Sequence, residues 1–248
     1  MNVFEQHGID HLSPSSCNRF VASPALFVME KLLKRAGTTG AGAHRGTSVE
    51  AAVAHGLMNQ TAPLAECVNI AIEKFKTLTS LSVDPRVEKE FENLAGYVEV
   101  GLKSLRPYGI PTSMQGKIEM TFDNLSVPIL GFYDFEFAGS NLLIDLKTSA
   151  TLSSKISASH ARQVALYAAA RKVDARIAYV TPRKSAVYGL ESVDEHLKAL
   201  VNIGVAIQKF LSQSADPMEL ASMVVPDIDS FYFNDPLTRA AAYDIWGI

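Results

Sequence analysis

Residues 127–148 read VPILGFYDFEFAGSNLLIDLKT, and this stretch decides the fold because its pattern predicts an antiparallel β-hairpin. Two β-rich segments, Val127–Phe137 and Asn141–Lys147, flank the turn residues AGSN. Successive side chains of a strand point to opposite faces, so the second segment presents two different faces. Its apolar face predicts that this strand lies against a hydrophobic core, and the residues on that face are Leu142, Ile144 and Leu146.

The other face of the same strand carries charge. Asp145 and Lys147 lie there beside Leu143, and a hairpin through AGSN brings Asp134 of the preceding strand close to Asp145. Two adjacent carboxylates repel each other, and a divalent cation removes that penalty. The structural alternative is a simple ion pair of Lys147 with either aspartate on an exposed sheet edge. These three charged residues alone do not decide between the two interpretations.

The segments on either side of the hairpin predict an α/β fold in which a central mixed β-sheet is flanked by helices. Helical spacing of apolar residues dominates before the hairpin, and after it come one helix, two strands and a further helix. In the first helical region we expect a break at Gly37–Thr47 and a second helix from about Thr47 to Met58. The expected helical regions are Ser23–Leu57, Ala65–Thr77, Pro85–Leu105, Ser157–Lys172 and Val193–Ser214, and the other expected strands are Gln115–Phe122, Arg176–Thr181 and Ala186–Gly189.

The length of 248 residues suits one domain over residues 1–248. We divide it into a helical N-terminal part (about 1–110), a core (about 111–190) and a helical, acidic C-terminal part (about 191–248). The net charge of −3 argues against a nucleic-acid partner, but its distribution does not. Residues 112–190 hold nine Lys/Arg against six Asp/Glu, and residues 191–248 hold three against nine. The middle of the chain can therefore present a basic surface.

Other features of the composition narrow the class of protein. No apolar run approaches the roughly 20 residues of a membrane span, and residues 1–10 show no secretory signal. The two cysteines, Cys17 and Cys67, are too few for a disulfide framework or a four-thiolate cluster. No Walker A motif is present, so we expect no helicase motor in this chain. We expect a soluble cytoplasmic protein (in the host cytoplasm if phage-encoded) with no membrane partner and no iron–sulfur cluster.

Four motifs occur in a suggestive order: G-T-S-V-E (46–50), G-F-Y-D (131–134), I-D-L-K-T (144–148) and Q-V-A-L-Y (163–167). Together they resemble the PD-(D/E)XK nuclease superfamily, in particular its RecB-type and phage lambda-exonuclease-type branches. The segment L-S-P-S-S (12–16), with Arg19, resembles the part that precedes these nuclease cores. The resemblance covers about residues 12–182 and implies a restriction-endonuclease-like core with helical additions at both ends.

The resemblance also implies roles for individual residues. Asp134 and Asp145 are similar to the family's metal carboxylates, the main-chain carbonyl of Leu146 would be a further ligand, and Glu50 would complete the metal shell. Oxygen ligands of this kind suit Mg²⁺ or Mn²⁺. Lys147 would orient or activate the attacking water, or stabilise the charge that develops on the phosphate. RecB-type members usually carry His at the position of Glu50, so this residue favours the lambda-exonuclease branch.

Seven further residues are candidates for supporting roles, and each has an ordinary structural alternative. Glu119 is a candidate outer acid or a plain surface residue of a strand. Gln163 and Tyr167, one helical turn apart, are candidate supporting residues or simple helix–sheet packing. Charge or hydroxyl chemistry suggests four candidate DNA contacts, which are otherwise ordinary surface or capping residues: Ser15, Arg19, Arg45 and His160.

Together these features predict a metal-dependent DNA nuclease that hydrolyses phosphodiester bonds and leaves 5′-phosphate ends. Glu50 and the stand-alone length favour an exonuclease in DNA recombination, repair or phage DNA processing. Two alternatives stay open: an endonuclease or structure-selective nuclease on the same core, and a catalytically inactive DNA-binding accessory protein of recombination. DNA is the expected partner, with a recombination protein as a second candidate. The sequence does not predict polarity, strand preference or oligomeric state.

Overall fold

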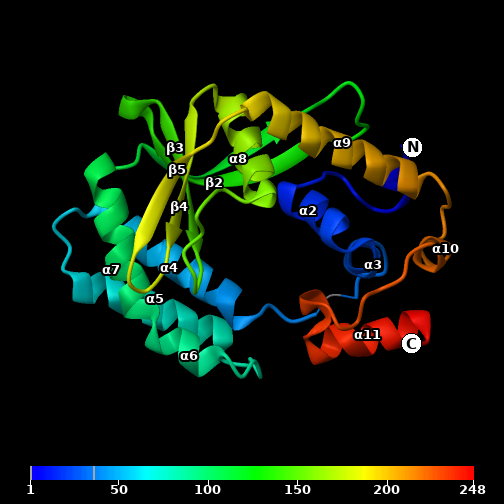
Figure 1. The fold of residues 1–248 in the computed structure, drawn as a ribbon, viewed down its shortest axis with the longest axis horizontal. Helices are drawn as coiled ribbons and strands as arrows, with labels where there is room; N and C mark the ends of the chain where they lie inside the picture. Colours follow the sequence, from blue (N-terminus) through cyan, green and yellow to red (C-terminus); the bar gives the residue numbers. More distant parts are fainter. Residues whose placement is uncertain (1, 36) are drawn as a thin grey trace. The chain divides into compact units, whose positions relative to one another are not determined.

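The computed structural model describes residues 2–35 and 37–248, which form two compact units (Figure 1). The terminal unit comprises Met1–Thr38, Ile118–Gly131 and Asp194–Ile248, and the central unit comprises Thr39–Lys117 and Phe132–Val193. That residues 1–248 act as one domain stays a prediction.

A five-stranded mixed sheet runs in the order β1-β2-β3-β4-β5. Strands β2 and β3 pair in antiparallel fashion, β3 and β4 in parallel, and β4 and β5 again antiparallel. The predicted α/β fold with a central mixed sheet is therefore confirmed. The strands are β1 (Ser113–Met120), β2 (Ile129–Phe137), β3 (Leu142–Thr148), β4 (Asp174–Val180) and β5 (Ser185–Gly189).

The predicted hairpin joins β2 to β3. A short 3₁₀ turn, Ala138–Ser140, is followed by Asn141 at φ 50°, ψ 47°. This left-handed conformation is one that Asn adopts more readily than most residues, and it turns the chain back on itself. The register then sets Phe137 opposite Leu142 and Phe135 opposite Ile144.

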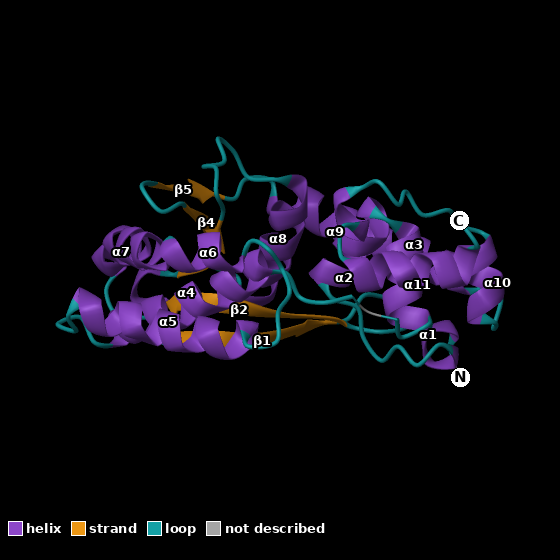
Figure 2. Ribbon diagram, turned by 90° about the horizontal axis from the view of Figure 1, so that it is seen from below, coloured by secondary structure: helices purple, strands orange, loops and turns teal. Residues whose placement is uncertain are grey.

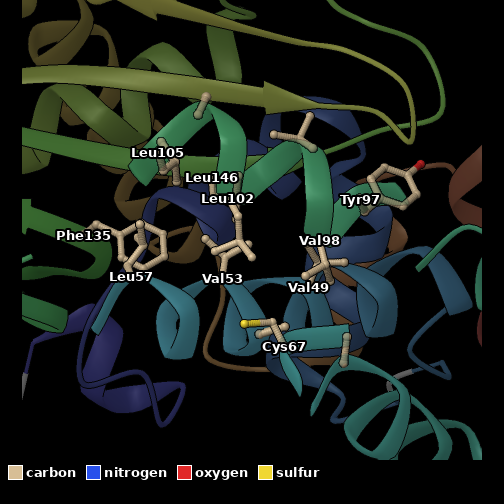
Figure 3. Packing of buried hydrophobic residues seen from close by; sticks show 14 of the residues in the cluster. Val49, Val53, Leu57, Cys67, Tyr97, Val98, Leu102, Leu105, Phe135 and Leu146 are labelled. Atoms are coloured by element: carbon tan, nitrogen blue, oxygen red, sulfur yellow. The ribbon is translucent and has the colours of Figure 1, made fainter. Parts of the chain in front are cut away.

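Two helices of the central unit, α4 (Ala41–Met58) and α7 (Leu94–Leu105), contact one face of the sheet, and α5 (Leu64–Thr79) packs against both of them. Figure 2 shows these helices gathered beside the strands. Their apolar sides form one core with β3 and β4, in which Leu57 and Leu102 lie near Phe135 and Leu146 (Figure 3). Leu142 and Ile144 are buried in the same core, so the predicted apolar face of β3 is confirmed.

Helix α8 (Ala158–Arg171) contacts β3 and β4 from the other side of the sheet. Ser157 caps its first turn by accepting a hydrogen bond from the His160 main-chain N–H, and Lys172 ends it in a left-handed conformation. Leu143 and Asp145 of β3 point to this face by strand alternation, and both are buried. The helix predicted over Ser157–Lys172 is therefore present.

Two expected helix boundaries in the central unit were wrong. Helix α4 begins at Ala41, inside the Gly/Thr-rich segment where we expected a break, because the Asp84 carboxylate accepts a hydrogen bond from the Ala41 N–H at 2.8 Å. That cap comes from a distant part of the chain. The helix expected over Pro85–Leu105 is two helices, α6 (Val87–Glu92) and α7. The Asn93 side chain donates to the Lys89 carbonyl at 2.7 Å and so competes with the main-chain bond there.

The terminal unit is mainly helical. A small apolar cluster joins Ala25, Leu26 and Met29 to Phe233, Ala241 and Ala242. No helix of the described residues has the length and apolar character needed to cross a membrane. The helices of this unit are α1 (Val3–Gln6), α2 (Pro14–Ala22), α3 (Pro24–Phe27) with a π-helical turn (Val28–Leu32), α9 (Val193–Leu211), α10 (Pro217–Ser222) and α11 (Pro236–Trp246).

Candidate active site

The hairpin brings the carboxylates of Asp134 and Asp145 together. Extending the register of Phe135 and Ile144 by one residue sets Asp134 opposite Asp145. The Asp134 Oδ2 atom accepts a hydrogen bond from the Leu146 main-chain N–H at 2.7 Å. Both aspartates are buried, with 8% and 2% of their surface exposed. The site therefore begins with two carboxylates held below the surface on adjacent strands.

Lys147 supplies positive charge beside these carboxylates. Its Nζ atom lies 2.6 Å from Asp145 Oδ2. The contact is one of charge, because Asp145 Oδ2 lacks a hydrogen-bond partner of good geometry in the described residues. Burial alone would lower the pKa of Lys147, but Asp145 and Asp134 raise it above its usual value. The ion pair considered from the sequence is thus present, but its Asp145 side is buried beside a second carboxylate, and the Lys147 side chain is only partly exposed.

A third carboxylate, Glu50, reaches the same place from α4. The Gln115 side chain donates hydrogen bonds to Glu50 Oε1 and, at 3.4 Å, to Asp134 Oδ1. Burial and the charge of Asp145 raise the pKa of Glu50. Burial, Asp145 and Glu50 together raise the pKa of Asp134 well above its usual range. The charge of Asp145 therefore opposes the ionisation of both Asp134 and Glu50.

Gln115 is a member of this cluster that the sequence did not indicate. It has a φ of +51°, a left-handed conformation that is rare for residues other than glycine. The next residue, Gly116, lies against the Tyr133 ring so closely that a Cβ there would overlap the ring. This local departure from regular strand geometry aims the Gln115 amide at the carboxylates. A sequence pattern shows a strand here, but it does not show which way this side chain points.

Helix α8 contributes Gln163 and Tyr167. The Gln163 amide donates to Asp145 Oδ1 at 3.4 Å and to the Tyr167 hydroxyl at 2.9 Å. Burial and the charge of Asp145 raise the pKa of Tyr167, so its hydroxyl stays neutral. His160 lies on the same helix, and its Nδ1 atom lies 2.7 Å from the Tyr179 hydroxyl. Burial and Lys147 lower the pKa of His160. The structure gathers these predicted residues around β3, and their catalytic or DNA-binding roles stay predictions.

Arg45, expected as a phosphate contact, is turned inward. Its Nη1 atom lies 2.6 Å from Glu90 Oε2, and its guanidinium donates to the hydroxyl and the main-chain carbonyl of Thr148 at 3.2 and 3.1 Å. The guanidinium also lies 4.8 Å from the centre of the Tyr97 ring. Only 7% of Arg45 is exposed. Its contacts thus tie α4 to the end of β3, directly after Lys147, and its role toward DNA stays a prediction.

Three other candidate residues belong to the terminal unit. Ser15 is exposed and shares a hydrogen bond of 2.8 Å with the Ser13 hydroxyl. Arg19 lies 3.5 Å from Glu30. Glu119 is exposed on β1. Their proposed roles at the site stay predictions.

The carboxylate cluster fits a divalent cation by its chemistry. No group of three or more His, Cys, Asp or Glu side chains in the described part of the chain is spaced as a finished metal site. Lys147 and Gln115 instead supply the positive and hydrogen-bonding groups at the carboxylates. However, Lys147 is one cation beside three carboxylates, and Asp134 and Glu50 have raised pKa values. Oxygen donors that repel one another in this way suit Mg²⁺ or Mn²⁺.

The sheet and the candidate site both lie within a segment that is similar to a known protein family. A family model described as the PD-(D/E)XK nuclease superfamily matches residues 11–227. No curated protein was found to match this chain. A solved structure titled "Crystal structure of SSO0001" is 14% identical, with 77% of this chain and 86% of that chain covered, at a TM-score of 0.35. That score is too low to support a structural argument, whereas the family match spans all four sequence motifs.

Proposed function

This chain belongs to the PD-(D/E)XK nuclease superfamily, and from that premise we propose that it is a divalent-metal-dependent nuclease that hydrolyses DNA phosphodiester bonds. The observation that carries the proposal is the convergence of Asp134, Asp145 and Glu50 beside Lys147. Asp145 Oδ2 within this cluster is buried and is balanced by the charge of Lys147 at 2.6 Å, while Asp134 beside it has a raised pKa. Buried carboxylates that repel one another cost stability, which favours a functional over a structural interpretation.

In this proposal Asp134, Asp145, Glu50 and the main-chain carbonyl of Leu146 hold Mg²⁺ or Mn²⁺. When bound, the ion supplies positive charge that neutralises the phosphate and favours attack by water. The Leu146 N–H fixes the Asp134 carboxylate, and the Gln163 amide orients the Asp145 carboxylate. These contacts hold both carboxylates in place before substrate arrives, which reduces the cost of ordering the site.

Lys147 acts as a fixed cation in this mechanism. In the metal-free site burial lowers the pKa of Lys147, and Asp145 and Asp134 outweigh burial and raise it. A protonated ammonium at this position stabilises negative charge that develops on the phosphate oxygens. We therefore assign Lys147 to charge stabilisation and to orienting the water.

The finer form of the proposal is an exonuclease of the RecB or lambda-exonuclease type that leaves 5′-phosphate ends in recombination, repair or phage DNA processing. Glu50 supports it, since the lambda-exonuclease branch favours Glu where RecB-type members carry His. The alternatives are an endonuclease or structure-selective nuclease on the same core, and an inactive DNA-binding accessory protein. DNA is the proposed partner in every version, with a recombination protein as a further candidate.

The test uses the purified full chain with end-labelled linear duplex DNA and covalently closed circular DNA, each with Mg²⁺, with Mn²⁺ and with EDTA. We expect the linear duplex to be degraded with either ion and to stay intact in EDTA, with 5′-phosphate products. Rapid cutting of the closed circle contradicts the exonuclease version. DNA binding without cleavage under any condition contradicts the nuclease proposal and favours the accessory protein.

A further inference from the structure

An open pocket of about 550 Å³ lies in the central unit between α7 and the turn that joins β4 to β5. Three cationic side chains line it together with two hydroxyls and one carboxylate, so its balance of charge is positive. These six residues are Lys103, Arg183, Lys184, Ser104, Ser185 and Glu99. A pocket of this composition suits an anion that carries several oxygen acceptors.

The turn that carries Arg183 and Lys184 is held rigidly by Thr181. The Thr181 main-chain N–H and hydroxyl donate to the Lys184 carbonyl at 2.9 and 2.8 Å. The same hydroxyl accepts a hydrogen bond from the Lys184 N–H at 3.1 Å. Thr181 itself is buried. The backbone positions of the two cations are therefore set by an internal network and do not depend on a ligand.

The turn also rests directly on α7. A Cβ at Gly96 would lie 2.6 Å from the Pro182 carbonyl oxygen, so only glycine allows this approach. Lys103 lies seven residues further along α7, about two helical turns, on the same side as Gly96. The close contact at Gly96 thus brings the cations of the turn and the cation of the helix around one pocket.

The three cations have no carboxylate partner among the residues that the structure describes. Arg45, Arg86 and Arg171 of the same unit, in contrast, each pair with a carboxylate at 2.6 to 2.8 Å. Lys103, Arg183 and Lys184 belong to none of the ion pairs found in the described ranges. Positive charge that the fold leaves unpaired is available to an external anion.

The pocket lies at the end of the sheet where the candidate active site lies. Strands β3 and β4 are parallel, Thr148 is opposite Val180, and the Ser149 N–H donates to the Val180 carbonyl at 3.0 Å. The β4–β5 turn begins directly after Val180, and Lys147 directly precedes Thr148. Both strands therefore end on the same side of the central unit, the pocket toward the α7 face of the sheet and Asp145 toward the α8 face. A nucleic acid that contacts both places passes around the ends of these two strands.

We propose that this pocket binds backbone phosphates of the nucleic acid whose cleavage we propose above, and this inference rests on that proposed function. Lys103, Arg183 and Lys184 neutralise phosphate charge, and Ser104 and Ser185 donate hydrogen bonds to phosphate oxygens. Contacts of this kind hold a nucleic acid in position without reading its sequence. Glu99 opposes binding and limits its strength.

The test compares two triple variants that remove the same charge. The pocket variant carries Lys103→Gln, Arg183→Gln and Lys184→Gln, and the control carries Lys76→Gln, Lys89→Gln and Lys209→Gln at exposed positions elsewhere. The Kd for a short fluorescent DNA duplex is measured in EDTA at several salt concentrations. We expect the pocket variant to weaken binding about tenfold or more and to reduce the salt slope by about 1 to 3. The control should change Kd less than about threefold.

A single variant that should strengthen DNA binding shows whether weaker binding by the triple variant comes from lost charge or from a folding defect. Glu99→Gln removes the one negative charge of the pocket and should tighten DNA binding about two- to threefold at low salt, because less repulsion opposes the phosphates. Equal Kd values and salt slopes for the pocket and control variants would overturn the inference. So would a variant that loses binding of inorganic phosphate while keeping its full affinity for DNA.

Cleavage assays separate this inference from the proposed function. If wild type degrades DNA with Mg²⁺, the pocket variant should raise KM and leave kcat at saturating DNA unchanged. If wild type cleaves no DNA but the pocket variant still loses affinity, the nuclease proposal fails and the phosphate pocket stands. If wild type cleaves DNA and the pocket variant matches the control in KM, the pocket proposal fails alone.

Discussion

Strand β2 buries two carboxylates whose surroundings are opposite: Glu136 at the turn end of the β2–β3 hairpin, and Asp134 farther from the turn, at what we call the open end. Near the turn, Glu136 accepts hydrogen bonds from Arg171 at 2.6 Å and from the Tyr133 hydroxyl at 2.7 Å. Burial would raise the pKa of Glu136, but Arg171 and Tyr133 bring it below its usual value. Two residues earlier, Asp134 faces Asp145 and Glu50, and its pKa is raised.

This difference shows that the partners of a buried carboxylate, and not its burial, indicate its role. A carboxylate surrounded by donors gains stability from ionisation and holds the fold together. A carboxylate that faces other carboxylates costs stability in the absence of a cation, and proteins keep such groups where function requires them. This contrast favours a structural role for the turn end and supports the chemical role that we propose for the open end, and substitutions can test the two separately.

The largest expected effect is at the open end. Lys147→Ala should lower the rate of DNA cleavage by about 10² to 10³-fold, because the fixed cation beside the phosphate is lost. Affinity for DNA in EDTA should stay within about threefold of wild type. The exposed Lys155→Ala is the matched control and should leave both quantities unchanged. Full cleavage by Lys147→Ala would place the site elsewhere.

At the turn end the expected effect is on stability. Glu136→Gln should lower the free energy of unfolding by about 1 to 3 kcal/mol, because the Arg171 bond loses its charge. The loss should stay below that of a fully buried ion pair, since the Arg171 side chain is 47% exposed. Urea unfolding measures it, and kcat should stay within a fewfold of wild type. Lost activity at unchanged stability would assign Glu136 to the active site and remove the contrast.

Arg45 joins α4, which carries Glu50, to the end of β3. Lysine cannot reproduce its forked contacts to Glu90 and Thr148, so Arg45→Lys should raise the metal concentration at half-maximal thermal stabilisation about tenfold. The matched control is Arg106→Lys. Arg106 donates to the main-chain carbonyls of Gly56 and Ala62, near the opposite end of α4.

Both substitutions should cost about 1 to 2 kcal/mol of unfolding free energy, because each removes partly buried hydrogen bonds from a charged donor. Only Arg45→Lys should change the metal titration. An equal effect of Arg106→Lys on that titration would show that general loosening of α4, and not the contact at Thr148, accounts for the result.

A smaller effect of opposite sign is expected for Asp134→Asn. Removing one of the mutually repelling carboxylates should raise the metal-free unfolding free energy by about 1 kcal/mol. The same variant should lose the rise in Tm that Mg²⁺ or Mn²⁺ gives the wild-type protein. Thermal melts with and without metal measure both. Destabilisation of the metal-free variant would mean that Asp134, like Glu136, is a structural carboxylate.

An effect of similar size, which declines at low pH, concerns Asp84, another carboxylate surrounded by donors. Its hydrogen bonds to Arg86 and to the Ala41 N–H hold its pKa below the usual value of 3.8. A lowered folded pKa contributes stability above the unfolded pKa, and this contribution is lost as pH falls through the folded pKa. Asp84→Asn should therefore cost about 1 kcal/mol at pH 7 and progressively less below about pH 4. Urea unfolding at pH 7 and below about pH 4 measures this cost. An equal loss of unfolding free energy in the two conditions would exclude the charge of Asp84 as the cause.

The local sequence pattern was enough to predict the hairpin and the proximity of Asp134, Asp145 and Lys147. Strand alternation and a short turn determine which side chains face each other, and both can be recognised within some 20 residues. The helix of Gln163 and Tyr167 follows from its own spacing and from the Ser157 cap. The family match over residues 11–227 covers all of these segments.

Contacts between distant segments were not predictable in the same way. The start of α4 depends on Asp84, which is 43 residues away along the chain from Ala41. The inward turn of Arg45 depends on Thr148, and the presence of Gln115 in the site depends on a φ that its residue type does not indicate. Each of these features is set by tertiary packing, which a local pattern does not contain.

The close contact between Gly116 and the Tyr133 ring has a consequence for the evolution of the chain. A side chain cannot be added at residue 116 while the large ring stays at residue 133, so the two positions are expected to change together in descendants of this sequence. Neither residue needs to take part in chemistry for this to hold. Gln115 and Asp134 are their immediate neighbours, so this steric fit constrains the backbone from which both side chains of the candidate site project.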